Sequence, residues 1–539
     1  NVQLPSFDIS RCDQSLTMNC NVTPTIVDDI DCCKLRLRAF GQFPNCQHIW
    51  EVRPVSSQQA LYSSKAQDAT WYITNINTSV VTQVVVYHKV TCNGSVLSET
   101  TTTYSFTNQG IFVGANPNIP SGPMPDPTAL ISLNTATCAF NSQLVFPTTT
   151  NAYGGNIFVN STLQIDRGTA SVGIVFNDAN VCVSECAGID VLENRRLRIS
   201  NVTGNGSVHE GNCGAWRGIN VKNTGTLRLE GASNTNEMLS LTVRGAMQAV
   251  RTLSGANCTT NNTRFTNNYV GVFATGTLTS LAVPNAPFLT NTRFTTSGAL
   301  PTPCYGVAAP ELLSRAGGTY SVARGFVGIL ALNSNLRING VTAGSVQFSA
   351  LANGLWTENP VSTSSVNAVV SNCTFNGINV LAAYGNLRSG RVIYFLHNAG
   401  GRRLNVTGNV ISNGAAGIVA ESQAPGTVLV ATGNNFSNCS RSVDMVQGAA
   451  GQFGIWNPGS VTTLIQGNAF AFSQLAAVRF TTSSANASTI RILNNTNNFT
   501  VSAGDGILLQ SPAGAVANNI TVSGNTIQHN SNNLSLIHI

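Results

Sequence analysis

Acidic and basic side chains gather most densely in one short stretch of the chain. Its members are Glu185, Asp190, Glu193, Arg195, Arg196 and Arg198. Carboxylate oxygens are the ligands that Ca²⁺ prefers, and carboxylates and guanidinium groups together form strong hydrogen bonds to polar ligands such as sugars. The stretch therefore predicts either a calcium or sugar site, or solvated ion pairs at the edge of a strand.

Two tryptophans lie among glycine- and proline-containing turns. Trp356 follows Gly354, and Trp456 precedes Pro458. An exposed indole ring gives a flat apolar surface on which a sugar ring can stack, whereas a buried one fills a corner of the core. The sequence leaves both interpretations open.

The remaining acids do not form a catalytic pattern. From residue 128 onward they are sparse, no two share a motif, and none recurs at a constant spacing. A glycosidase needs paired carboxylates, and a serine hydrolase needs a Gly-x-Ser-x-Gly turn that is absent from the sequence. We predict no catalytic residue and no cofactor or metal. Calcium is the one ion considered, and the pattern does not indicate it.

Charge and hydropathy exclude two classes of partner. Only 9% of the 539 residues are charged, the net charge is +6, and arginine pairs such as Arg402-Arg403 stand alone. Nucleic-acid binding requires a dense basic patch, so none is expected. No apolar run approaches the roughly 20 residues of a membrane-spanning helix.

The cysteines suggest an extracellular location, whereas the glycosylation sequons have two interpretations. Fourteen cysteines without a zinc-ligand spacing favour disulfides, which persist outside the cytoplasm. The candidate disulfide cysteines are Cys12, Cys20, Cys46, Cys92, Cys182 and Cys186, of which Cys182 and Cys186 would close a small loop; the sequence does not fix the pairing. Sequons arise by chance in an Asn-rich bacterial chain or carry glycans in a eukaryotic one; they begin at Asn21, Asn77, Asn93, Asn160, Asn201, Asn257, Asn372, Asn405, Asn486 and Asn519.

A short phrase repeats through the second half of the chain, of the form apolar-x-Gly-Asn-x-apolar. Its marker asparagines recur every 25 to 37 residues, at 372, 409, 434, 468, 495 and 525. Repeats of this length build solenoids, and the Val-, Ile- and Thr-rich runs between turns predict strands. A coil that stacks each strand on its counterpart would align the asparagines into a ladder of hydrogen-bonded amides.

The first hundred residues follow another pattern. Residues 33–40 and 49–53 alternate apolar and polar side chains, and Asn93-Gly94 joins two β-branched runs at 82–92 and 95–106. Asn-Gly between such runs predicts a β-hairpin. Trp50 and Trp71 are the expected core aromatics of a small antiparallel sandwich.

These patterns divide the chain into five segments. We expect an irregular N-terminal segment at 1–30, an immunoglobulin-like β-sandwich at 31–112, a Pro-rich linker at 113–127 and a parallel β-helix at 128–535. Residues 536–539 break the Asn-rich style, so we interpret them as a non-native tail after a truncated C-terminus.

Both regions resemble known families. The Gly-Asn repeats resemble the right-handed parallel β-helices of the pectate-lyase-like superfamily, and residues 31–112 resemble PKD-type domains. Trp216-Arg217-Gly218-Ile219, the Gly225-Thr226-Leu227 rung and Asn267-Asn268 with Gly271-Val272 are similar to the first coils of secreted β-helix proteins of Bacteroidota. That resemblance implies type IX secretion and attachment at the cell surface.

Two functions are consistent with these observations. The first is a non-catalytic extracellular or cell-surface structural protein, an adhesin, stalk or filament subunit whose β-helix is a rigid spacer that self-associates end to end into fibres. Glycans or other surface proteins would be its partners. The alternative is a protein that binds or cleaves polysaccharides, as a lyase or hydrolase.

Overall fold

The computed structural model describes the following residues: 24–26, 34–39, 46–66, 68–72, 83–92, 94–105, 110–113, 131–132, 143–144, 152–159, 162–165, 173–183, 185–210, 214–233, 235–275, 289–304, 316, 320–340, 345–358, 368–381, 384, 389–398, 402–456, 461–471, 473–483, 486–499, 505–510, 518–529 and 537–538. The chain divides into two compact units, Asn1–Gln109 with Asn116–Pro120, and Gly110–Ala115 with Ser121–Ile539.

The first unit contains two antiparallel sheets. One has the order β4-β3-β6-β7, with strands Tyr62–Ser64, Cys46–Pro54, Gln83–Cys92 and Ser95–Ser105. The other has the order β1-β2-β5, with strands Pro24–Ile26, Lys34–Ala39 and Asp68–Tyr72. The hairpin predicted around Asn93-Gly94 is confirmed, because β6 and β7 pair antiparallel along their length. Trp50 is fully buried and stacks on His88 with ring centroids 3.6 Å apart, whereas the side chain of Trp71 lies outside the described residues.

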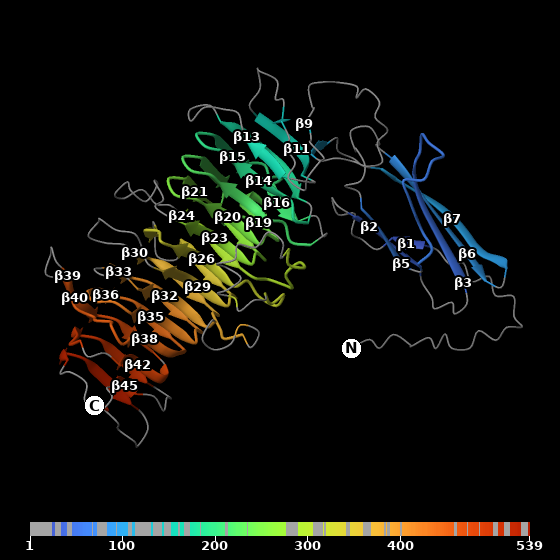
Figure 1. Ribbon diagram of the computed structural model, residues 1–539. Helices are drawn as coiled ribbons and strands as arrows, with labels where there is room; N and C mark the ends of the chain where they lie inside the picture. The colour runs from blue at the N-terminus through green and yellow to red at the C-terminus, as the bar shows by residue number, and fades with distance from the viewer. Residues whose placement is uncertain are drawn as a thin grey trace, which may run out of the picture. The chain divides into compact units, whose positions relative to one another are not determined.

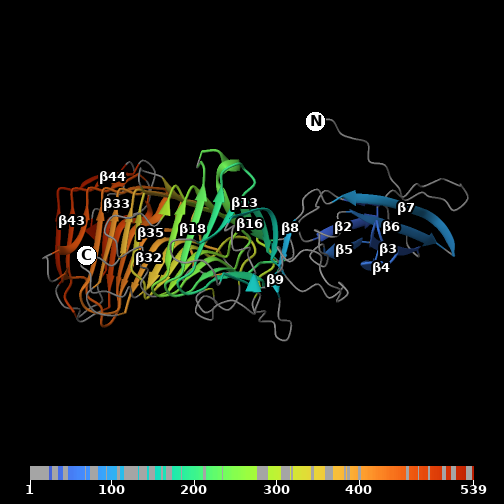
Figure 2. The same ribbon diagram turned by 90° about the horizontal axis from the view of Figure 1, so that it is seen from above.

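The second unit is an all-β parallel solenoid of the β-helix kind. Its thirteen-stranded sheet, sheet 1, stacks strands that follow one another at one per coil (Figures 1 and 2). In order these are β12 (Thr162–Ile165), β14 (Gly188–Val191), β17 (Gly218–Val221), β20 (Gln248–Thr252), β23 (Val270–Thr275), β26 (Val327–Leu332), β29 (Asn353–Glu358), β32 (Arg391–His397), β35 (Ala416–Ser422), β38 (Cys439–Gln447), β42 (Ser473–Thr482), β45 (Asp505–Gln510) and β48 (Ile537–His538).

Two further sheets complete the coils. Sheet 2 runs through β27 (Leu336–Asn339), β30 (Ala368–Ser371), β33 (Arg402–Thr407), β36 (Thr427–Thr432), β40 (Val461–Gln466), β43 (Thr489–Leu493) and β46 (Asn519–Ser523), and β39 (Ile455–Trp456) pairs with β40. Sheet 3 runs through β8 (Gly110–Val113), β11 (Ala152–Val159), β13 (Ile174–Val183), β15 (Arg196–Asn201), β16 (Ser207–Glu210), β18 (Thr226–Gly231), β19 (Leu241–Arg244), β21 (Asn257–Asn261), β22 (Thr263–Thr266), β24 (Leu289–Thr290), β25 (Arg293–Thr295), β28 (Val346–Ser349), β31 (Cys373–Asn376), β34 (Val410–Ser412), β37 (Asn435–Ser437), β41 (Ala469–Phe470), β44 (Thr496–Phe499) and β47 (Thr526–His529).

The N-terminal edge of the stack includes a strand from before residue 128, where the sequence predicts the β-helix to begin. Strand β8 pairs in parallel with β11. The short strands β9 (Ile131–Ser132) and β10 (Gln143–Leu144) pair antiparallel with each other, and a 3₁₀ helix, η4, spans Glu237–Leu239. Apart from Val113, the predicted linker lies outside the described residues, and so does the predicted segment 1–30 apart from β1.

Alternate residues of each strand point into the coil and build one continuous core. Because strands stack in register, like side chains meet from coil to coil. Phe265, Phe294, Phe348 and Phe375 form a stack with centroids 4.6–4.9 Å apart and rings within 8° of parallel. Stacks of this kind combine burial of large apolar rings with favourable ring geometry.

The predicted asparagine ladder is confirmed for five of its six members. Asn409, Asn434, Asn468, Asn495 and Asn525 are joined by Nδ2–H···Oδ1 bonds of 2.9–3.0 Å, and the Nδ2 group of each also donates to a backbone carbonyl of the preceding coil.

Asn372 was wrongly included in the predicted ladder. It has φ +56° and occupies the left-handed corner position that Gly408 (φ +65°) holds in the next coil. Cys373 occupies the ladder position instead and donates its backbone N–H to Asn409 Oδ1. The sequence pattern places the ladder position one residue too early in this coil, because asparagine tolerates the same left-handed conformation as glycine.

A second apolar cluster covers the outer face of sheet 1 over its middle strands. Its members from sheet 1 include Phe273, Leu330, Trp356 and Tyr394, none more than 5% exposed. Residues of the long connections between sheets 3 and 1 pack over them: Leu300, Cys304, Ala316, Tyr320, Phe326 and Tyr384. The sheet is therefore buried on both faces over these middle strands.

Candidate functional site

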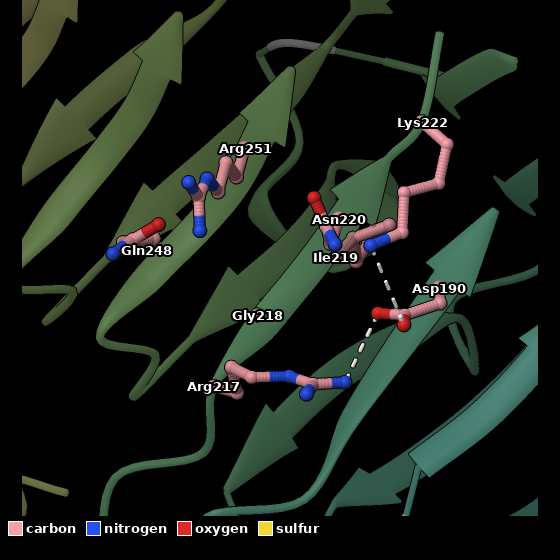
Figure 3. Close-up of a pocket in the computed structure, with 8 residues that line it drawn as sticks. All are labelled: Asp190, Arg217, Gly218, Ile219, Asn220, Lys222, Gln248 and Arg251. Carbon is pink, nitrogen blue, oxygen red and sulfur yellow. Dashed lines mark hydrogen bonds and ion pairs between the residues drawn. The ribbon is translucent and has the colours of Figure 1, made fainter. Parts of the chain in front are cut away.

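A pocket of about 360 Å³ lies on the outer face of sheet 1, upstream of the covered region (Figure 3). Strands β14, β17 and β20 and the residues at their ends supply its lining. The lining residues are Asp190, Arg217, Gly218, Ile219, Asn220, Lys222, Gln248 and Arg251. Its volume is at the lower end of the range for small-molecule sites.

Strand register places the polar side chains together. Asp190, Asn220 and Arg251 are partners in successive strands and form one outward row. The residues just before them, Ile189, Ile219 and Val250, form the inward row and are fully buried in the core. Since side chains alternate along a strand, burying the apolar row forces the polar row outward.

Two stacked glycines contribute to the hollow. Gly188 and Gly218 are register partners. A Cβ atom on Gly188 would come within 2.7 Å of Arg217 Nε, and one on Gly218 within 1.6 Å of the Gln248 carbonyl oxygen. Gly218 also has φ +116°, a conformation that other residues rarely adopt. Side chains are therefore excluded where these strands approach the pocket.

The single carboxylate of the pocket is paired with two cations. Asp190 Oδ1 accepts a hydrogen bond from Arg217 Nη2 at 3.0 Å, and Asp190 Oδ2 lies 4.0 Å from Lys222 Nζ. Arg217 Nη2 also donates to Thr162 Oγ1 at 3.1 Å, on the preceding strand β12. With Arg251 as a third cation, the pocket has a net charge of two positive charges.

Three buried polar atoms of the pocket have no hydrogen-bond partner among the described residues. They are Arg217 Nε, Asn220 Oδ1 and Arg251 Nε. The Arg251 guanidinium lies 5.5 Å from the ring centroid of Phe273, and no described carboxylate pairs with it. Buried polar atoms are normally hydrogen-bonded, so three unpartnered atoms around one cavity point to a ligand with complementary groups.

The structure does not bring the six predicted charged residues into one site. Asp190 alone lines the pocket, while Arg196 and Arg198 lie on β15 in sheet 3, where Arg198 pairs with Glu230 at 2.7 Å. Glu185 and Glu193 are exposed residues of the turns on either side of β14, and Arg195 immediately precedes β15. The coil turns a corner between β14 and β15, which separates neighbours in sequence onto different faces. Their role as ligands stays a prediction.

Trp356 is not an exposed stacking platform, so that alternative is wrong for this residue. Its side chain is 5% exposed and its Nε1–H donates to Glu358 Oε1 at 2.8 Å. Arg391 lies over the rings of Trp356 and Tyr394 and pairs with Glu421 at 3.4 Å. Burial strongly raises the pKa of the Tyr394 hydroxyl. The side chain of Trp456 lies outside the described residues.

The predicted small disulfide loop between Cys182 and Cys186 is wrong. Cys186 bonds to Cys304, 118 residues away, while Cys182 is buried on β13. The pairing depends on how far the connection after β25 folds back along the outer face, which sequence spacing does not show.

Cys46 is disulfide-bonded, and its register partner in β6 is Cys92, whose side chain lies outside the described residues. Their pairing stays a prediction, and so does that of Cys12 and Cys20, which the description does not cover.

Burial restricts the sequons. Asn201 is 1% exposed and its Nδ2 donates to the carbonyls of Met238 and Ser240, so the folded chain offers no room for a glycan there. Asn486 and Asn519 are exposed. Asn257, Asn372 and Asn405 are half-buried, and the sequons at Asn21, Asn77, Asn93 and Asn160 lie outside the described residues.

Sequence reasoning missed most of the pocket. Arg217, Asn220, Lys222, Gln248 and Arg251 were not among the predicted ligand residues. The signal was present in the spacing, since Asp190, Asn220 and Arg251 lie 30 and 31 residues apart, one coil each. Finding it requires aligning coils by their inward residues first and then examining the outward row.

No group of three or more His, Cys, Asp or Glu side chains in the described ranges is placed to hold a metal ion. None of the helices in the described part of the chain is long and apolar enough to cross a membrane. No protein-family model, no curated protein and no solved structure matches this chain.

Proposed function

We propose that this chain is a non-catalytic extracellular or cell-surface structural protein whose β-helix is a rigid spacer. The observation that carries the proposal is the unbroken stacking of sheet 1 together with the asparagine ladder. Thirteen strands separated by twelve intervals of about 4.8 Å give a column about 58 Å long. A buried core and aligned hydrogen bonds between adjacent coils resist bending.

The disulfides support the location. The Cys186–Cys304 bond and the disulfide of Cys46 are of the kind that persists in an oxidising compartment. We propose that the coil is right-handed, as in pectate-lyase-like proteins, and that the first unit is a PKD-type, immunoglobulin-like sandwich serving as an adaptor. The resemblance to Bacteroidota surface proteins supports type IX secretion.

End-to-end association is part of the proposal. Strand edges at the ends of a stack carry backbone donors and acceptors that a further parallel strand can pair with. Contacts that repeat head to tail without closing produce fibres rather than rings. Such growth would make the spacer an adhesin stalk or a filament subunit.

Electron microscopy of the purified full chain, with sedimentation as a function of concentration, tests the spacer proposal. Stiff rods that lengthen in steps of one chain support a filament, and single stiff rods support a stalk or adhesin. Flexible or globular particles contradict the rigid spacer. Incubation with acidic polysaccharides tests the non-catalytic part, because release of unsaturated or reducing sugars would show that the chain is an enzyme instead.

A further inference from the structure

We propose that the pocket between β14, β17 and β20 binds a small ligand that carries an oxyanion, a carboxylate, sulfate or phosphate group, next to a hydroxyl group. A rigid spacer requires no such pocket, so the site goes beyond the proposed function. Arg251 is the anion-binding residue of this site, and Asn220 receives the hydroxyl group.

The case for the anion begins with the state of Arg251. Its Nε is buried without a hydrogen-bond partner, and its guanidinium is held over Phe273. This buried Nε–H group has lost its hydration without gaining a hydrogen bond in exchange. An oxyanion that accepts from its parallel N–H groups restores the missing bonds, and charge-assisted bonds of this type are the strong ones.

A second arginine in the same outward row shows what a satisfied site looks like. Arg479 on β42 donates from Nε and Nη2 to both oxygens of Asp444, each at 2.7 Å. Asp444 is its register partner on the preceding strand β38. The register partner of Arg251 on the preceding strand is Asn220, which is neutral. Beside Arg251, a neutral asparagine therefore occupies the register position that the carboxylate of Asp444 occupies beside Arg479.

The other cations of the pocket are already occupied. Arg217 and Lys222 share the single carboxylate of Asp190, so one of the two net positive charges lies on this group and the other on Arg251, which has no described carboxylate partner. The Nε of Arg217 has no partner and remains available as a second donor. In Figure 3, dashed lines join Asp190 to Arg217 and to Lys222, and none reaches Arg251.

The hydroxyl group follows from Asn220. Its Oδ1 is buried and unpartnered, and it lies in the same row as Arg251. A carbonyl oxygen accepts but does not donate, so this atom requires an O–H or N–H group on the ligand. An anion alone would leave it unsatisfied. Hydroxy acids and phosphorylated or sulfated polyols have both groups within a few bonds of each other.

Isothermal titration calorimetry of the full chain at low ionic strength tests the proposal. The probes are sulfate, inorganic phosphate, acetate and glycolate, the last two differing by one hydroxyl group. We expect binding that weakens with added salt, with glycolate bound more tightly than acetate. Arg251→Gln should weaken binding of the bound probes by about tenfold or more, the loss of a charge-assisted pair.

Two variants distinguish the site from its surroundings. Arg479→Gln removes an arginine from the same row and should leave probe binding unchanged. Asn220→Ala should abolish the preference for glycolate over acetate while sulfate binding remains. Circular dichroism and amide hydrogen exchange verify that each variant is folded.

Three results would overturn the proposal. They are no binding of any probe at millimolar concentration, equal binding by the folded Arg251→Gln chain, and equal weakening by Arg479→Gln, which would indicate general attraction of anions to a basic protein. Sulfate and phosphate binding without carboxylate binding, or the reverse, assigns the anion to one chemical class.

Discussion

The corner position that asparagine occupies in the downstream coils is occupied by other residues in the upstream coils. Downstream, Asn409 to Asn525 fill the corner with amides that bond to one another in series. Upstream, Thr263 and Thr292 occupy this corner after left-handed asparagines. Each hydroxyl contacts a backbone carbonyl of its own coil and one group of the preceding coil, the Leu229 carbonyl or the Thr260 hydroxyl. An amide has donors and an acceptor in fixed positions, so it can connect both neighbours, whereas one hydroxyl group satisfies fewer atoms.

The outer face of sheet 1 differs between the same regions. Upstream, no carboxylate in the described part of the chain pairs with Arg251, which borders a pocket, while downstream Arg479 is paired with Asp444. The regular downstream coils fit the proposed rigid spacer, and the upstream coils hold the pocket in which we propose that a ligand binds. On the two proposals made above, a single solenoid would separate rigidity and recognition along its length.

Removing one amide from the ladder should have the largest effect. Asn468→Ala deletes two bonds donated by Nδ2 and leaves the backbone N–H and Nδ2 of Asn434 without their acceptor. At about 1–3 kcal/mol for each buried group left unsatisfied, we expect a loss of about 4 kcal/mol in local stability. Amide hydrogen exchange of β36, β40 and β43 measures it.

The matched control is a second row of bonded asparagines, Asn376, Asn413 and Asn438, which is exposed to solvent. Asn413 donates to Asn376 Oδ1 and accepts from Asn438 Nδ2, all in solvent. Asn413→Gly retains the left-handed conformation of φ +54° and should cost less than about 0.5 kcal/mol. Equal losses in both variants would mean that burial of the amides does not matter.

Removing the disulfide should have the next largest effect, confined to the upstream coils. The double variant Cys186→Ser, Cys304→Ser detaches the connection that contains Cys304 from the turn before β14. We expect the free energy of unfolding to fall by about 3 kcal/mol. Exchange should accelerate around β14, β17 and β20 and stay unchanged in β36, β40 and β43. Acceleration along the whole stack would show that the two regions unfold together.

Acid should weaken the coils around β32. Burial, followed by the nearby charge of Arg402, lowers the pKa of His397 to about 4 from 6.5. The unfolded chain therefore takes up a proton before the folded chain does. The contribution of His397 to the free energy of unfolding is complete above pH 6.5. It is lost as the pH falls toward 4, by at most about 1.4 kcal/mol per pH unit.

Exchange in β32 and β35, compared between the parent chain and His397→Gln, isolates this dependence. His88 in the first unit has its pKa lowered to about 4 by burial, so a whole-chain melting curve would mix the two groups. A parent chain with the same pH slope as the variant would rule out His397 as the titrating group.

The upstream corner should be the least sensitive. Thr263 Oγ1 has 3.1 Å contacts with the carbonyls of Leu229 and Asn261, and both contacts are lost in the similarly shaped Thr263→Val. We expect a loss of about 1 kcal/mol, measured as faster exchange in β18 and β22. A loss as large as that of Asn468→Ala would erase the distinction between the two corners.

The sequence predicts the solenoid because its information repeats. Four Gly-Asn corners, such as Gly433-Asn434, and the Asn494-Asn495 corner indicate the same local geometry, so several weak signals combine into one fold prediction. The hairpin at Asn93-Gly94 is equally local. These features depend on residues a few positions apart, where turn chemistry decides the structure.

The pocket and the disulfide were missed because they depend on contacts between coils. Asp190 and Arg251 line one pocket only because the two coils between β14 and β20 are in register, and turn lengths vary from coil to coil. Cys186 and Cys304 meet through a connection that leaves the regular path altogether. Neither distance is encoded by a short motif.

The ladder amides also have a direction. The Nδ2 groups of Asn409, Asn434, Asn468 and Asn495 each donate to the asparagine one coil further along, and none of these side-chain bonds runs the other way. The column of amides therefore has a direction, and its two ends differ. Another coil can extend it only by running the same way, because two like ends would oppose donor to donor or acceptor to acceptor. Any fibre built by continuing this ladder would have a plus end and a minus end.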